Sequence, residues 1–120
     1  MKKLFKDILE IDNVEGVMFL TFEGETIYRE FSAEFAKESG LKDKKGRWAM
    51  LIDALDGARE ADAVFEDRRI YIRKAESGYI VVIMDAYASI AMVRLNCDIL
   101  LPELKNKKTS RGFLGLFKKN

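Results

Sequence analysis

Two runs of consecutive apolar residues constrain the fold of this chain more than any other feature. Residues 79–84 read Tyr-Ile-Val-Val-Ile-Met, and residues 17–22 read Val-Met-Phe-Leu-Thr-Phe. A strand with one face in water alternates apolar and polar residues, whereas a strand that is buried on both faces is apolar nearly throughout. Both runs therefore predict inner strands of a sheet covered on both faces, and the more hydrophobic run at 79–84 should lie centrally.

The segments around these runs predict the remaining strands and the helices that cover the sheet. Strands are expected at 26–31, 62–66 and 69–74, with a hairpin turn at Glu23-Gly24 and a weak helical turn around 34–36. Helical periodicity covers about 2–12, 47–60, and a closing helix from a Ser89 cap to about 104, which Pro102 should end soon after. The order of these elements predicts an α+β fold, a mostly antiparallel five-stranded sheet with helices on both faces.

Length and composition exclude several classes of protein. A chain of 120 residues forms one domain with a core that needs no disulfide or metal, and a single Cys suits a reducing compartment. The sequence contains no His, which removes imidazole metal ligands and His-based catalytic triads. No apolar run approaches the length of a transmembrane helix. We therefore expect a soluble cytoplasmic protein that is not an enzyme, binds no metal or cofactor, and does not act at a membrane.

Charge is distributed unevenly along the chain. Residues 105–120 contain six Lys and Arg and no acid, so with a net charge of +1 the remaining residues carry −5. This division predicts a folded body at 1–104 and a basic, flexible tail at 105–120. The tail should act as a docking peptide whose apolar anchors are Phe113, Leu114, Leu116 and Phe117.

Three patterns suggest chemistry, and each has a simpler explanation. Gly40 and Gly46 near lysines do not match the spacing of a phosphate-binding loop. Cys97 lies on the apolar stripe of the closing helix without a base, as a buried structural thiol would. Arg69, Tyr71 and Arg73 alternate on one strand face and could contact nucleic acid, but helices should cover that face, so we expect no nucleic-acid partner.

The helix at 47–60 has more apolar surface than one sheet requires. Its apolar residues span about 200° on a helical wheel, and a helix that covers a single sheet needs about half of that arc. The strand at 62–66 would also be an unprotected edge. Pairing that strand with its twofold copy would satisfy both features, so we expect a homodimer. The expected interface residues are Trp48, Leu51, Ile52, Leu55, Ala63, Val64 and Phe65.

In order, these elements resemble the roadblock family, named from the dynein light chain, over about residues 5–104. The passage from the last strand into the last helix, Asp85-Ala-Tyr-Ala-Ser-Ile-Ala-Met-Val-Arg94, carries most of the resemblance, together with Val14-Glu-Gly-Val17 and Glu23-Gly24. It implies a profilin-like sheet in the order 2-1-5-4-3, with the first and last helices on one face and the middle helix on the other. It also implies homodimers formed through the third strand and the middle helix.

The resemblance further implies a non-catalytic regulator or scaffold of a Ras-like small GTPase. The alternatives are a general scaffold without a GTPase and a profilin-like or PAS-like sensor of a small ligand. For a GTPase, the expected docking surface is the exposed side of the paired middle helices. Its candidate residues are Lys45, Arg47, Met50, Asp53, Ala54 and Gly57.

Overall fold

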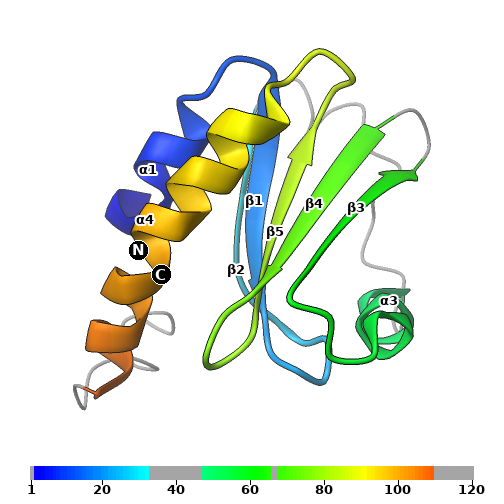
Figure 1. Cartoon of the computed structure of the whole chain (residues 1–120), viewed down its shortest axis with the longest axis vertical. Helices are drawn as coiled ribbons and strands as arrows, with labels where there is room; N and C mark the ends of the chain where they lie inside the picture. The colour runs from blue at the N-terminus through cyan, green and yellow to red at the C-terminus, as the bar shows by residue number, and fades with distance from the viewer. Residues whose placement is uncertain (1, 33–46, 66–67, 110–120) are drawn as a thin grey trace.

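The computed structural model describes residues 2–32, 47–65 and 68–109. A single sheet lies between two helices on one face and one helix on the other (Figure 1). In chain order the elements are α1 (Lys2–Leu9), β1 (Val14–Leu20), β2 (Thr26–Phe31), α3 (Arg47–Leu55), β3 (Glu60–Phe65), β4 (Arg68–Lys74), β5 (Tyr79–Met84) and α4 (Ile90–Thr109).

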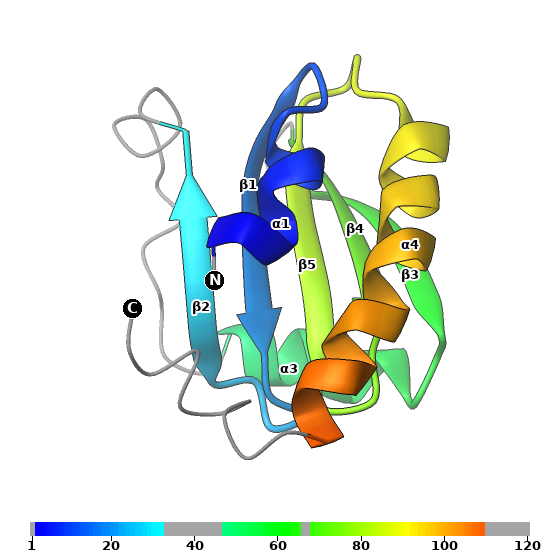
Figure 2. The same cartoon turned by 90° about the vertical axis from the view of Figure 1, so that its left-hand side faces the viewer.

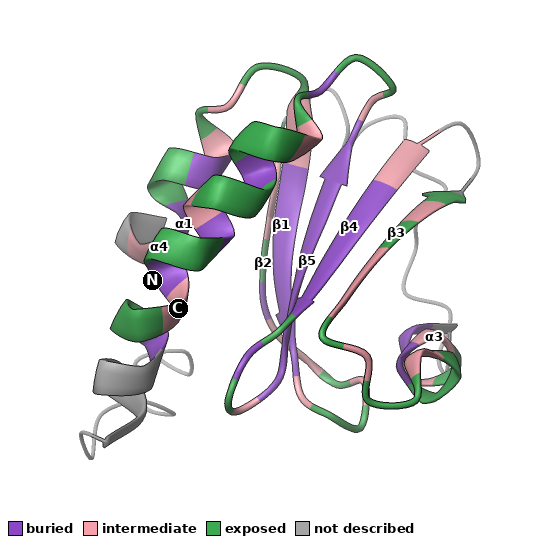
Figure 3. Cartoon of the chain, viewed as in Figure 1, coloured by how far each residue is buried: buried purple, intermediate pink, exposed green. Residues whose placement is uncertain are grey.

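The strands form one antiparallel sheet in the order β2-β1-β5-β4-β3. β5 lies at the centre between β1 and β4, and all six of its residues are buried (Figure 3). The apolar run at 79–84 therefore predicted a doubly covered central strand correctly. The strand order implied by the roadblock resemblance is confirmed as well.

Each face of the sheet carries its own apolar cluster. α1 and α4 lie side by side on one face, and α3 lies on the opposite face at one end of the sheet (Figure 2). Alternate residues of β4 illustrate the division, since Tyr71 belongs to the cluster under α1 and α4 while Ile70 and Ile72 belong to the cluster under α3. This alternation is the period of two that a pleated strand imposes.

Two helices end earlier than periodicity predicted. α1 stops at Leu9, and a turn that contains left-handed Asn13 (φ 71°) then leads into β1. α3 stops at Leu55, and Asp56 and Gly57 have φ 49° and 78°. A left-handed residue just after a helix is a common way of ending it.

The closing helix begins as predicted but ends later. The Met92 backbone N–H donates to Ser89 Oγ at 3.2 Å, so Ser89 is the N-cap. The prediction that Pro102 ends the helix soon afterwards was wrong, since α4 continues to Thr109. Leu100 and Leu104, on either side of Pro102, are both buried in the core, and this packing compensates for the helical hydrogen bond that proline cannot donate.

The hairpin turn at Glu23-Gly24 joins β1 and β2 as expected and packs against the start of α3. Gly24 has φ 91°, and a Cβ there would lie 2.5 Å from the Ala49 Cα atom. Glycine is therefore required at this position by both conformation and space.

The turn expected around 34–36 lies outside the described residues. None of the described helices combines the length and apolar character needed to cross a bilayer.

Candidate interaction surface

β3 forms an open edge of the sheet within the described residues, where it pairs only with β4. The Lys74 backbone N–H donates to the Arg59 carbonyl at 2.8 Å, next to the pair Glu60 and Arg73. Because bonded and non-bonded pairs alternate in an antiparallel ladder, Glu60, Asp62 and Val64 direct their backbone groups away from β4. The outer edge of β3 is therefore a template for a further strand.

α3 packs on the sheet more completely than the helical wheel indicated. Trp48 and Ile52 are buried, and Leu51 and Leu55 are half-buried against the same apolar cluster. The helical wheel predicted more apolar surface than one sheet requires, yet all four side chains contact this one cluster, and Leu51 and Leu55 keep part of their surface exposed. Their burial within one chain therefore gives no independent support for a dimer.

The surface that remains exposed near α3 and β3 is small and mixed in character. Met50 is 76% exposed on α3, and Val64 is 79% exposed on β3. Asp53, Ala54 and Gly57 are also exposed, and Ala63 is half-buried. The side chains of Arg47 and Phe65, the whole of Lys45, and the four tail anchors of residues 113–117 lie outside the described residues.

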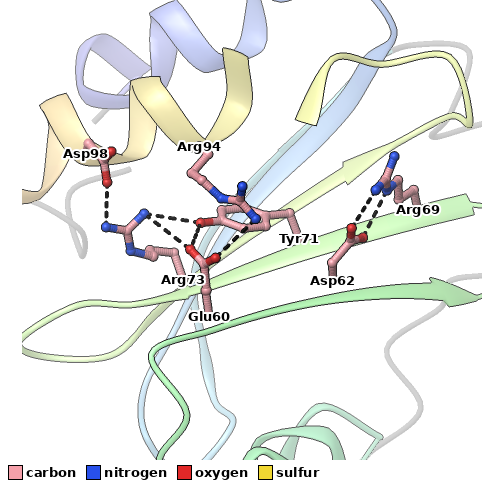
Figure 4. Close-up of polar contacts among 7 residues, drawn as sticks. All are labelled: Glu60, Asp62, Arg69, Tyr71, Arg73, Arg94 and Asp98. Carbon is pink, nitrogen blue, oxygen red and sulfur yellow. Dashed lines mark hydrogen bonds and ion pairs between the residues drawn. The ribbon is translucent and has the colours of Figure 1, made fainter. Parts of the chain in front are cut away.

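On the opposite face, a polar network joins β3, β4 and α4 (Figure 4). Arg73 on β4 is only 2% exposed and forms an ion pair with Asp98 on α4. It also donates from Nη1 to the Tyr71 hydroxyl at 3.1 Å, and that hydroxyl donates to Glu60 Oε2 on β3 at 2.7 Å. Arg94 on α4 completes the network, with 3.1 Å between its Nη2 and Glu60 Oε1.

The network shifts the titration of its members. The hydrogen bond from Tyr71, aided by the charges of Arg94 and Arg73, lowers the pKa of the Glu60 carboxyl. The bidentate hydrogen bonds from Arg69 likewise lower the pKa of Asp62. Burial raises the pKa of Tyr71. These groups therefore hold the charge states that fasten β3 and α4 to β4 at neutral pH.

The network decides what the row of Arg69, Tyr71 and Arg73 does. The row does share one strand face, as its alternation predicted, and that face meets α4. Arg69 and Arg73 form ion pairs with acidic partners, and Tyr71 is fully buried. The row is therefore a structural element that holds β3 and α4 to β4.

Sequence reasoning missed the acidic partners in this network. Asp98 follows Arg94 by four residues on α4, and Glu60 and Asp62 share the period of two of β3. Both spacings were visible as patterns in the sequence. Their meaning depended on the pairing register of β3 with β4, which the sequence did not reveal.

The polar side chains of the described residues do not gather into a metal site, and the one cysteine lies in the core. Among the described residues, no group of three or more acidic, Cys or His side chains could hold a metal ion. Cys97 is fully buried, and burial raises the pKa of its thiol to about 12. The interpretation of Cys97 as a buried structural residue is confirmed.

Comparison with known proteins identifies the fold. No protein-family model and no curated protein matches the chain. Among solved structures, MglB in a tetrameric arrangement has a TM-score of 0.64 at 10% identity, covering 98% of this chain and 87% of that one. Myxococcus xanthus MglB has a TM-score of 0.64 at 16% identity, covering 87% of each chain. The Roadblock/LC7 domain from Streptomyces avermitilis has a TM-score of 0.64 at 10% identity, covering 92% of this chain and 95% of that one.

The sheet order and the helices on both faces define an α+β domain of the profilin-like type. The fold is that of the Roadblock/LC7 domain and of MglB. The resemblance drawn from the sequence is thus confirmed at the level of the fold.

Proposed function

We propose that this chain is a non-enzymatic, homodimeric regulator or scaffold of a Ras-like small GTPase. The observation that carries the proposal is the open edge of β3 beside α3 in a chain with the roadblock fold. The GTPase partner follows from the roadblock resemblance of the sequence, and the fold supports it. The proposed protein acts through binding surfaces alone, in the cytoplasm, without a cofactor.

The dimer would form by antiparallel pairing of β3 with its copy. The outward backbone groups of Asp62 and Val64 would then find partners, and the two sheets would become one continuous sheet. The exposed Val64 and the half-buried Leu51 and Leu55 would lie near the twofold axis. We expect an interface above about 1,200 Å² in total, as in ordinary stable complexes.

The GTPase would dock on the outward side of the paired α3 helices. Met50, Asp53 and Ala54 are exposed there, and the partner would bury this patch. Stimulation of hydrolysis would come from ordering the switch segments of the GTPase, since positioning and electrostatics dominate that reaction. An arginine supplied in trans from Arg47 or Arg59 is a further option that the resemblance does not imply.

Substitution of Val64 by proline tests the dimer. Val64→Pro removes the outward-pointing N–H of an edge strand. The monomer should still fold, and the dissociation constant of the dimer should rise at least about tenfold. Val64→Thr keeps the N–H and is the matched control. Sedimentation velocity at micromolar concentration measures both variants. A monomeric native protein, or an intact Val64→Pro dimer, would refute pairing through β3.

The GTPase assignment needs a separate measurement. Asp53→Lys should weaken binding to the cognate Ras-like GTPase, while Glu103→Lys on α4 should not. Calorimetry with the nucleotide-loaded GTPase measures both affinities. Hydrolysis of GTP by the purified chain alone would contradict the non-enzymatic assignment.

A further inference from the structure

α4 exposes an apolar stripe that no described element covers. Met92, Leu95 and Ile99 are 47%, 52% and 57% exposed. Their spacing of three and four residues places them on one face of the helix, away from Val93, Leu100 and Leu104 on its buried face. We call these three residues the α4 stripe. A large apolar residue exposed alone is ordinary, but three in a row form a continuous contact surface.

The stripe opens at its N-terminal end into an acidic groove between α1 and α4. This groove of about 600 Å³ is lined by Asp7, Glu10 and Asp12, and by Tyr87 and Met92. Tyr87 is 88% exposed. The one cation described beside these carboxylates is Lys6, whose Nζ lies 3.8 Å from Glu10 Oε1. The groove and the stripe share Met92, so they form one surface that is apolar along α4 and acidic at its end.

We propose that the chain's own C-terminal segment, residues 110–120, docks on this surface. Its sequence is Ser-Arg-Gly-Phe-Leu-Gly-Leu-Phe-Lys-Lys-Asn, which places four large apolar residues before two lysines. Laid antiparallel to α4, Leu116 and Phe117 would lie beside Ile99 and Leu95 of the stripe, and the long side chains of Lys118 and Lys119 would reach the acidic groove. The order of apolar and basic residues in the segment matches the order of apolar and acidic features on the surface.

The length of the segment fits this placement. At 1.5 Å of rise per residue, about 26 Å of helix separates Thr109 from Met92. Eleven extended residues span about 36–40 Å. The difference leaves about three residues for reversing the chain direction before Phe113. The segment can therefore reach the groove from the end of the same α4, without help from a second molecule.

The covalent connection and the charges favour this occupant over the others that the surface could accept. A tethered peptide binds at a high effective concentration, so modest contacts are sufficient for docking. The carboxylates of the groove would repel an anionic membrane, which the basic segment alone would attract. A docked segment would also be withheld from protein partners, and partners that bind α4 would release it. This inference is independent of the proposed GTPase partner and of the dimer.

A spin label at the C-terminus tests the proposal in the full chain. In the Asn120→Cys variant the nitroxide should attach at position 120. The chain's one natural cysteine, Cys97, is fully buried, and burial raises the pKa of its thiol to about 12. With a nitroxide at position 120, the amide NMR signals of Asp12, Tyr87 and Met92 should broaden. Those of Asp53 on the opposite face should not. An undocked segment would place the label about 17–20 Å from Thr109 on average in all directions, so it would broaden the signals at the C-terminal end of α4 more than those of the groove.

Two kinds of variant separate docking from chance proximity. Leu95→Lys on the stripe should reduce the broadening at least several-fold, whereas Met50→Lys, an equally drastic change at an exposed site on α3, should leave it unchanged. If Leu95→Lys disturbs the fold, the double change Lys118→Glu and Lys119→Glu leaves the folded body untouched and should have the same effect. Broadening that survives both stripe and lysine changes would refute docking.

Mixing identifies the source of the segment. When isotope-labelled protein without nitroxide is mixed with unlabelled protein that carries it, docking within one chain gives no broadening in the groove. Broadening in the mixed sample would instead assign the surface to the segment of a second copy. Broadening that is absent from both samples would leave the stripe to another partner and overturn the proposal.

Discussion

Arg73 shows how a single buried charge can organise three elements. Its guanidinium lies between Asp98 of α4 and the Tyr71–Glu60 pair, so it joins the last helix to the open edge of the sheet. A buried charge is tolerated only when it is paired and hydrogen-bonded. Arg73 meets that condition through Nη1 and Nη2, which contact Tyr71, Glu60 and Asp98, while its buried Nε has no hydrogen-bond partner among the described residues.

Removing the Asp98 carboxylate should destabilise the fold. Asp98→Ala leaves Arg73 buried with Tyr71 and a longer contact of 3.7 Å to Glu60. We expect the free energy of unfolding to fall by about 1–3 kcal/mol, measured by urea denaturation. Glu103→Ala, at an exposed site of the same helix, is the control and should change it by less than about 0.5 kcal/mol. Equal stability of the two variants would show that the ion pair contributes nothing.

The carboxyl groups of β3 should make the free energy of unfolding fall at low pH. Glu60 and Asp62 have pKa values lowered from their ordinary 4.5 and 3.8. Their contribution is therefore complete above about pH 4.5 and is lost as the pH falls through the lower pKa values of the folded state. Urea midpoints between pH 7 and pH 2.5 should fall less steeply for the double variant Glu60→Gln and Asp62→Asn. An unchanged slope would contradict the network's role.

At the scale of elements, α4 demonstrates that packing can override a strong local signal. Pro102 lacks the N–H that would bond the Asp98 carbonyl, and its ring crowds that carbonyl. The helix nevertheless continues, because Leu100 and Leu104 are 4% and 3% exposed on the core. The C-terminal turns of α4 are thus held by tertiary contacts and not by helix propensity.

Replacing Pro102 should show how much the missing hydrogen bond destabilises the protein. Pro102→Ala restores a backbone donor at an exposed site without changing the core, so the free energy of unfolding should rise by about 1–3 kcal/mol. Thermal and urea denaturation followed by circular dichroism measure the change. Glu103→Ala again serves as the control. Destabilisation by Pro102→Ala would mean that the proline supports a conformation other than the continuous helix.

At the scale of the whole molecule, the two sides of the sheet have separate tasks in our proposals. The α3 face and the β3 edge offer the surface for a second copy and a GTPase. The α4 face offers a surface for the chain's own C-terminal segment. The sheet lies between them (Figure 1), so each surface can be altered without touching the other.

Deletion of residues 109–120 should leave the dimer intact. The proposed interface lies at β3 and α3, across the sheet from α4, and the deleted residues lie beyond the last buried side chain described, Leu104. Sedimentation velocity of the truncated and full chains should give the same oligomeric state. Dissociation on truncation would show that the basic segment belongs to the dimer interface and that our division of the chain at about 104 is wrong.

The sequence by itself determined the order of the elements and the central place of β5, because a run of six apolar residues is soluble only when both of its faces are covered. It also determined the cap at Ser89 and the turn at Gly24, since these depend on local hydrogen bonding and backbone conformation. The tertiary structure decided where helices end, how α3 uses its wide apolar arc, and that α4 passes through Pro102. It also decided which carboxylates meet Arg73. Those features depend on contacts between residues far apart in the chain, and local patterns do not contain the energies of such contacts.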